Sequence, residues 1–171
     1  LNRVAWLGDR FLAVGNGGRI VTSSNGTLWS AITGSGATGD LFCVAGTGAM
    51  YVVGGNNELR LRRSTGWSDQ LALTGTFFPA PRWTYYAAGY DGASFLVGGP
   101  TGMLVSGFYT NLVGTVWTPL SQSLRPWLWD VARLPAGGMV AVGDYGSILT
   151  SERGTRWEVE LTPPGATNSV L

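Results

Sequence analysis

The chain has 171 residues, enough for one domain with a sizeable core. Its formal net charge is +1 and only 12% of its residues are charged, which excludes strong electrostatic attraction to nucleic acid or anionic lipid. It contains no histidine, so a Ser-His-Asp triad is excluded and zinc or copper sites lose their usual ligands. No apolar run reaches about 18 residues, so we expect no membrane span.

Residues 1–40 contain four short apolar segments, each bounded by glycine, asparagine, aspartate or another turn residue. We predict strands at 1–7, 11–14, 19–23 and 28–33, joined as an antiparallel meander. The turn at 16–18 reads Asn-Gly-Gly, and both residue types accept the positive φ that tight hairpin turns require. A helical reading fails because the apolar runs are too short and glycine recurs too often.

The rest of the chain repeats this pattern three more times, at 41–83, 84–127 and 128–171. Each copy has an apolar pair, a glycine, a tight turn, a β-rich run and a tryptophan: Ala13-Val14-Gly15 to Trp29, Val52-Val53-Gly54 to Trp67, Leu96-Val97-Gly98 to Trp117 and Ala141-Val142-Gly143 to Trp157. The glycines are 39, 44 and 45 residues apart. We therefore predict an all-β fold, a β-propeller of four-stranded antiparallel blades, as a single domain or as a segment of a larger ring. We expect the four tryptophans to fill the gaps between stacked blades.

Two segments carry a family resemblance. Residues 18–29 read Gly-Arg-Ile-Val-Thr-Ser-Ser-Asn-Gly-Thr-Leu-Trp, and residues 146–157 read Gly-Ser-Ile-Leu-Thr-Ser-Glu-Arg-Gly-Thr-Arg-Trp. These segments are similar to bacterial neuraminidase repeats, also called Asp-box repeats, and the chain resembles photosystem II assembly-factor-like propellers. The aspartate of that pattern is Asn25 in the first copy and Arg153 in the fourth. Asn25 can still cap its turn by accepting from nearby backbone N–H groups, whereas Arg153 cannot.

The resemblance includes sialidases, which need an arginine cluster, a tyrosine activated by glutamate, and an aspartate. The acids of this chain do not suit such a site, because Glu58 is expected at a turn and Glu152 in a hairpin loop. Only Asp130 is predicted on an inner strand. We therefore expect no catalytic residues, no metal site and no cofactor. Arg60, Arg62 and Arg63 are interpreted as an exposed or edge strand, with an anion or partner site as the alternative.

The predicted binding surface is the face where the loops between blades and the loops after each second strand emerge. That face collects aromatic and arginine side chains, the residue types that dominate binding hot spots. The predicted binding residues are Arg82, Trp83, Arg125, Trp127, Asp144 and Tyr145, with Phe77 and Phe78 nearby. In an alternative interpretation, Trp83 and Trp127 plug the ends of the cores between blades.

These observations favour a non-catalytic interaction or scaffold module that binds a protein or peptide through this loop face. Two alternatives stay open, a purely structural segment of a larger secreted or envelope protein and a glycan-binding module. The expected partners are another protein or other segments of a larger chain, with self-association through open blade faces, and no nucleic acid. The last residues resemble the approach to another first strand, so we expect a segment of a longer chain or a ring completed by another copy.

Overall fold

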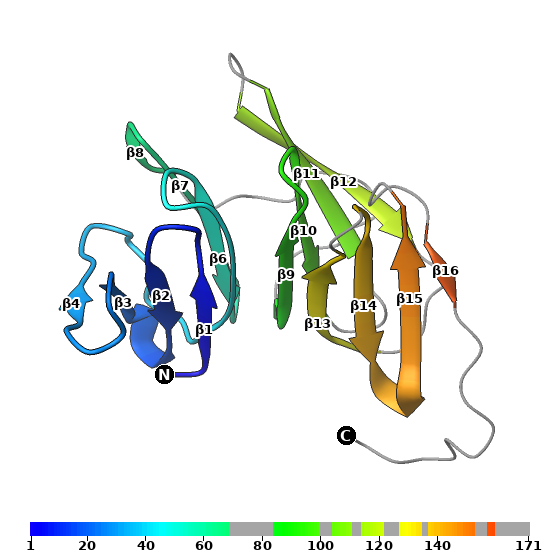
Figure 1. Cartoon of the computed structure of the whole chain (residues 1–171), viewed down its shortest axis with the longest axis horizontal. Helices are drawn as coiled ribbons and strands as arrows, with labels where there is room; N and C mark the ends of the chain where they lie inside the picture. Colours follow the sequence, from blue (N-terminus) through cyan, green and yellow to red (C-terminus); the bar gives the residue numbers. More distant parts are fainter. Residues whose placement is uncertain are drawn as a thin grey trace. The chain divides into compact units, whose positions relative to one another are not determined.

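The computed structural model describes residues 1–68, 84–99, 104–110, 114–121, 127–134, 137–152 and 157–159. These residues form four antiparallel sheets of four strands each, with no α-helix among them (Figure 1). The predicted all-β class and the four-stranded antiparallel meanders are confirmed. The sheets are grouped into two compact units, Leu1–Tyr85 and Tyr86–Leu171.

The N-terminal unit contains the first and second sheets. The strands of the first sheet are β1 (Arg3–Trp6), β2 (Phe11–Val14), β3 (Ile20–Ser23) and β4 (Ser30–Ala31). Those of the second sheet are β5 (Leu41–Gly46), β6 (Tyr51–Gly55), β7 (Glu58–Arg63) and β8 (Gly66–Trp67). A short 3-10 turn, η1 (Asn16–Gly18), joins β2 to β3.

The C-terminal unit contains the third and fourth sheets. The strands of the third sheet are β9 (Ala87–Tyr90), β10 (Ser94–Gly98), β11 (Leu104–Thr110) and β12 (Gly114–Ser121). Those of the fourth sheet are β13 (Leu128–Arg133), β14 (Met139–Gly143), β15 (Ser147–Ser151) and β16 (Glu158–Val159), with η3 (Asp144–Gly146) after β14. In the third sheet, β11 and β12 form a long ladder that reaches Thr110↔Gly114 and includes the pair Phe108↔Val116.

Each unit buries an apolar core between its two sheets. The N-terminal core consists of Leu7, Leu12, Val14, Ile20, Leu41, Val44, Tyr51 and Val53. The C-terminal core consists of Ala87, Leu96, Leu128, Val131, Met139, Ala141 and Leu149. Burying a large apolar side chain is worth about 1.5–3 kcal/mol, so this packing of sheet against sheet is the main stabilising term in each unit.

Two of the four recurring tryptophans pack as predicted. Trp67 packs against the N-terminal core, with its ring 5.5 Å from that of Tyr51, and Trp157 packs against the C-terminal core. The prediction is wrong for Trp29, which is exposed and donates its indole N–H to Gly26 O at 3.1 Å. That bond folds Trp29 back over its own hairpin. The side chain of Trp117 lies outside the described residues.

The repeat has a different frame from the one read in the sequence. The residue at or just before the start of a sheet donates its N–H to the carbonyl oxygen of the glycine that ends or follows the second strand of the preceding copy. The bonds are Leu41 N to Gly15 O, Tyr85 N to Gly55 O and Leu128 N to Gly99 O, at 3.1–3.2 Å. The equivalent glycines are therefore Gly15, Gly55, Gly99 and Gly143, which are 40, 44 and 44 residues apart. Gly54 and Gly98, chosen from the Val-Gly pattern, precede the true position by one residue.

The Asn25 cap is confirmed. Its side-chain oxygen accepts from the backbone N–H groups of Thr27 and Leu28, both at 3.0 Å. An asparagine therefore closes this hairpin through the acceptor chemistry expected of the aspartate. The equivalent Arg153 lies outside the described residues.

Candidate functional site

Three of the predicted binding residues are described, and they lie at one end of the fourth sheet. Trp127 immediately precedes β13, and Asp144 and Tyr145 follow β14 in the turn η3. Arg82, Trp83 and Arg125, and the neighbouring Phe77 and Phe78, lie outside the described residues.

The backbone brings the two loops together at this end of the sheet. Asp144 donates its backbone N–H to Trp127 O at 2.9 Å. The approach is possible because Gly143 has no side chain, since a Cβ there would overlap the carbonyl oxygen of Trp127. The expectation that the loop before a first strand and the loop after a second strand emerge together is confirmed here.

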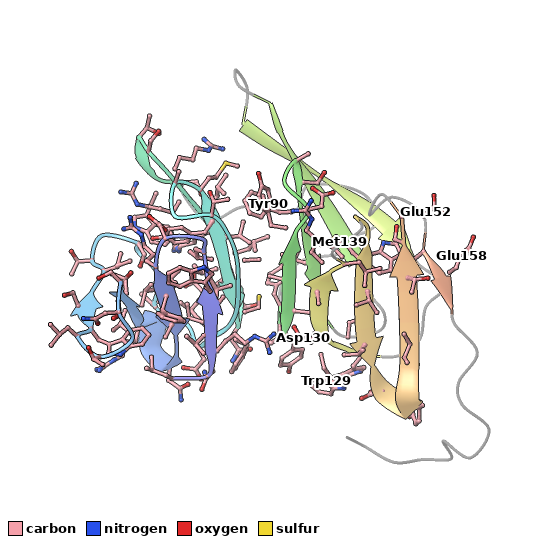
Figure 2. The ribbon with its side chains drawn as sticks, viewed as in Figure 1. Tyr90, Trp129, Asp130, Met139, Glu152 and Glu158 are labelled. Carbon is pink, nitrogen blue, oxygen red and sulfur yellow. The ribbon has the colours of Figure 1, made fainter. Side chains whose placement is uncertain are left out.

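A β-bulge turns a further tryptophan toward solvent. Leu128 pairs with Gly143 and Asp130 pairs with Val142, so Trp129 is the extra residue of the β13–β14 ladder. Its side chain is exposed, and Figure 2 shows it with Asp130 at the end of β13 remote from Met139. The second sheet has the same bulge between Leu41 and Cys43.

Three aromatic rings meet at this end of the C-terminal unit. The centroids of Tyr86 and Trp127 are 5.9 Å apart with an interplanar angle of 18°, so these rings are stacked. Trp129 lies 5.1 Å from Tyr86 and 5.7 Å from Trp127. We call Tyr86, Trp127 and Trp129 the aromatic cluster. Trp127 and Trp129 are both exposed and neither belongs to the buried core, which speaks against the interpretation of Trp127 as a core plug.

Asp144 fixes the orientation of one of these rings. The indole Nε1–H of Trp129 donates to Asp144 Oδ1 at 2.6 Å. A charge-assisted bond of this length restricts the rotation of the indole, so the ring is held in place before any partner arrives. The second carboxylate oxygen supplies an acceptor and negative charge beside the rings.

Tyr145 has a strained backbone. It sits in the left-handed region at φ +59°, where a bulky side chain is uncommon, and its side chain is 65% exposed. The equivalent positions in the first two copies hold Gly17 at φ +64° and Asn57 at φ +53°, residue types that tolerate this conformation. No burial of the Tyr145 ring offsets the strain, and uncompensated strain of this kind is common at functional sites.

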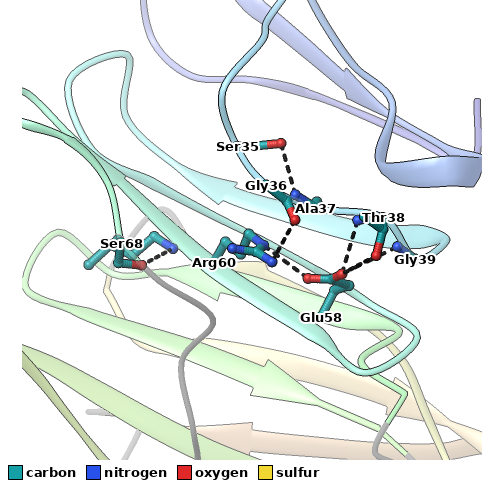
Figure 3. Close-up of polar contacts among 9 residues, drawn as sticks. Ser35, Gly36, Ala37, Thr38, Gly39, Glu58, Arg60 and Ser68 are labelled. Carbon is teal, nitrogen blue, oxygen red and sulfur yellow. Dashed lines mark hydrogen bonds and ion pairs between the residues drawn. The ribbon is translucent and has the colours of Figure 1, made fainter.

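The charged cluster on β7 has a structural role. Glu58 is buried on β7 and accepts from the backbone N–H groups of Thr38 and Gly39, at 3.0 and 3.3 Å, as Figure 3 shows. Arg60 donates from Nε to Glu58 at 2.9 Å and from Nη2 to Gly36 O at 2.7 Å. The pair therefore ties the segment entering the second sheet to β7. The placement of Glu58 at a turn and of the arginines on an exposed or edge strand is wrong, because β7 lies between β6 and β8.

Hydrogen bonding sets the charge state of Glu58. Burial by itself would raise the pKa of its carboxyl group, but the N–H donors of Thr38 and Gly39 and the guanidinium of Arg60 outweigh it. The pKa of Glu58 therefore lies below its ordinary value of 4.5. The ion pair is satisfied within the fold, which leaves it poorly suited to bind an external anion.

Sequence reasoning missed Tyr86 and Trp129. Both occupy the second position of a copy, after Tyr85 and Leu128, and the equivalent residues are Asn2 and Phe42. The signal was present as an aromatic residue at the same repeat position in three successive copies, Phe42, Tyr86 and Trp129. Strict alternation of side chains along a strand does not predict a bulge, so it did not indicate that Trp129 faces solvent.

The described residues show neither a metal-binding cluster nor a membrane-spanning helix. They hold no group of three His, Cys, Asp or Glu side chains that could bind a metal ion. They also hold no helix of the length and apolarity that crossing a membrane requires. Cys43, on β5, is buried, as is usual for a small apolar residue.

Comparison with known proteins gives distant structural likenesses, without a match to a family model. No protein-family model matches the chain, and no curated protein sequence matches it. Among solved structures, the chain is similar to "YCF48 bound to D1 peptide", with a TM-score of 0.47 and 14% sequence identity over 95% of this chain and 67% of that chain. The family resemblance of residues 18–29 and 146–157 therefore stays an expectation from the sequence.

Proposed function

We propose that this chain is a non-catalytic β-propeller module that binds a protein or peptide partner through the aromatic cluster. In this proposal the four sheets are blades, and the binding surface is the end of the C-terminal unit where Trp127, Trp129 and Asp144 meet. The contact geometry of the three rings carries the proposal, because it gathers exposed aromatic surface at one place.

Exposed tryptophan and tyrosine rings favour this role on energetic grounds. Such rings bury a large area on binding and lose little conformational entropy, and they are enriched at binding hot spots. Two features reduce the cost of binding further: the Trp129–Asp144 hydrogen bond at 2.6 Å and the mutual stacking of Tyr86 and Trp127. A surface ordered in advance retains more of its interaction energy as affinity.

The difference between the copies favours a single protein partner over a repeated glycan. A glycan-binding module would need several equivalent pockets, but the N-terminal unit has Asn2 and Asp40 at two of the three positions of the aromatic cluster. A glycan-binding module and a purely structural segment remain the alternatives that the experiments below address.

The non-catalytic part of the proposal rests on the residue types of the chain. It has no histidine, and the buried pair Glu58–Arg60 is engaged by the backbone. The carboxylate of Asp144 accepts from the indole N–H of Trp129. We also propose, from the sequence, that the protein works outside the cytoplasm, in a secreted or envelope setting.

Selection from a random linear peptide library tests the proposal directly. Peptides enriched on the parent chain should bind Trp129→Ala about tenfold or more weakly, because the variant loses one ring and the anchor for Asp144. Trp129→Phe should give a smaller loss, since it keeps a ring but has no indole N–H. Fluorescence anisotropy with the labelled peptide measures both affinities.

Phe42→Ala is the matched control, because Phe42 occupies the same bulge position in the N-terminal unit. It should leave peptide affinity unchanged. Equal binding by the parent and Trp129→Ala would overturn the assignment of the surface. Enrichment on a glycan array with no enrichment of peptides would overturn the choice of partner.

A further inference from the structure

The first sheet has one apolar face that is open to solvent. We call it the leading face; it carries Leu1 and Val4, which are 71% and 56% exposed. A groove of about 320 Å³ runs along it, lined by Leu1, Asn2, Arg3, Val4, Ala13 and Trp29. Contiguous exposed apolar surface of this kind marks an interaction site.

The same face is covered in the second and fourth sheets. Register makes the three valines equivalent, because Val4 pairs with Ala13, Val44 with Val53 and Val131 with Ala141. Val44 and Val131 are only 5% and 6% exposed, and Leu41 and Leu128, the equivalents of Leu1, are fully buried. What covers each of them is the other sheet of its own unit.

The fourth sheet has the complementary exposed face. We call it the trailing face. On the first sheet the trailing face carries Leu7 and Val14, which pack into the N-terminal core and are 4% and 0% exposed. The equivalent residues of the fourth sheet are Leu134 and Val142, at 38% and 41% exposed. Val140 and Ile148 lie on the same side by register.

Both units therefore follow one packing rule, in which the trailing face of one sheet packs on the leading face of the next. In the N-terminal unit, Val14 and Val44 share a core cluster. In the C-terminal unit, Leu96 and Val131 do the same. The leading face of the first sheet and the trailing face of the fourth sheet are both exposed to solvent.

We propose that the leading face of the first sheet binds the trailing face of the fourth sheet in a second copy of this chain. The contact continues the sheet stacking already present inside each unit and alters no contact within either. It is heterologous, because different surfaces meet, and such contacts close into rings when the rotation permits. The proposal is independent of the aromatic cluster and of any partner that binds there.

Light scattering coupled to gel filtration tests the proposal through mass. The parent should have a mass of at least twice 18.1 kDa that falls on dilution. Val4→Asp and Val142→Asp should each raise the dissociation constant about tenfold or more, because each buries an unpaired charge in the contact. Both side chains are exposed within one chain, so the variants should keep the parent circular dichroism spectrum.

Leu28→Asp is the matched control, since Leu28 is 77% exposed and does not line the groove. It should leave the assembly intact. A parent that is monomeric across the dilution series would overturn the proposal, and so would an assembly that survives Val4→Asp unchanged.

Cross-linking distinguishes the second copy from other arrangements. A short bismaleimide should join a Val4→Cys chain to a Val142→Cys chain in a mixture, and the parent with its buried Cys43 gives the background. A Val4→Cys chain that cross-links mainly to another Val4→Cys chain would overturn the head-to-tail contact. In the doubly substituted chain, a cross-link found only within a monomer would overturn the role of a second copy.

Discussion

The N-terminal and C-terminal units have the same backbone junction between their two sheets. The side chains around that junction differ, because they are mainly polar in the N-terminal unit and aromatic in the C-terminal unit. The backbone bonds are matched, because Leu41 N to Gly15 O and Leu128 N to Gly99 O are both 3.2 Å. In the N-terminal unit the surrounding side chains form a polar network. Asn2 Nδ2 donates to Asn16 Oδ1 at 2.7 Å and to Leu41 O at 2.9 Å, and Asp40 accepts from Gly17 N at 3.0 Å.

In the C-terminal unit the equivalent positions are aromatic. Tyr86 stands where the N-terminal unit has Asn2, Trp127 where it has Asp40, and Trp129 where it has Phe42. The repeat therefore constrains the backbone at the junction, whereas the side chains around it differ between the units. A fixed framework with variable side chains is the arrangement in which binding surfaces arise.

The largest expected effect comes from breaking the shared junction itself. Gly143→Ala and Gly55→Ala should each lower the free energy of unfolding by about 3 kcal/mol, because the new Cβ would overlap the carbonyl oxygen of Trp127 or Asp40. Urea denaturation measures the loss. Gly8→Ala is the control, with a positive φ but open space around it, and should cost about 1 kcal/mol. Equal costs at all three positions would refute the close-approach explanation.

A smaller loss of stability is expected on removing the buried carboxylate of Glu58, which belongs to the N-terminal unit. Glu58→Gln should cost about 2 kcal/mol at neutral pH, because Arg60 and the Thr38 N–H lose a charged partner. The folded pKa of Glu58 is depressed, so its contribution is present above the ordinary value of 4.5 and is lost as pH falls through the folded pKa. The stability difference between the parent and the variant should therefore shrink below about pH 4.5.

Denaturation at several pH values checks this window. Glu152→Gln serves as the control, because Glu152 is exposed, and it should change stability by less than about 0.5 kcal/mol. A difference between the parent and Glu58→Gln that is independent of pH would contradict the role assigned to the carboxylate.

The smallest change in stability is expected at Tyr145, in the turn η3. Tyr145→Asn should stabilise the chain by about 1 kcal/mol, because asparagine tolerates the left-handed conformation that Asn57 adopts in the N-terminal unit. The reciprocal Asn57→Tyr should destabilise it by a similar amount. If Tyr145 serves binding, Tyr145→Asn should also weaken the peptide affinity. Thermal unfolding of both variants provides the test. A loss of stability in Tyr145→Asn would show that contacts of the tyrosine ring offset the backbone strain.

Much of the secondary structure could be predicted because the information is local. Turn residues and short apolar runs fix where strands begin and end, and the expected strand at 11–14 has the bounds of β2. Asn25 was predicted to cap its turn because Asx capping depends on only a few neighbouring residues. The repeat frame was misread by one residue at Gly55 and Gly99, since the Val-Gly pair is a sequence pattern and the junction bond is a contact between copies.

The sequence by itself determined the all-β class, the four copies and the proximity of Trp127 to Asp144, because period and turn chemistry act along the chain. Contacts across strands and sheets place Trp129 on a bulge next to Tyr86 and pair Arg60 with the buried Glu58. They also leave apolar residues exposed on one face of the first sheet and one face of the fourth. These features depend on which residues oppose one another across strands and sheets, and a one-residue shift in register exchanges the buried face for the exposed one.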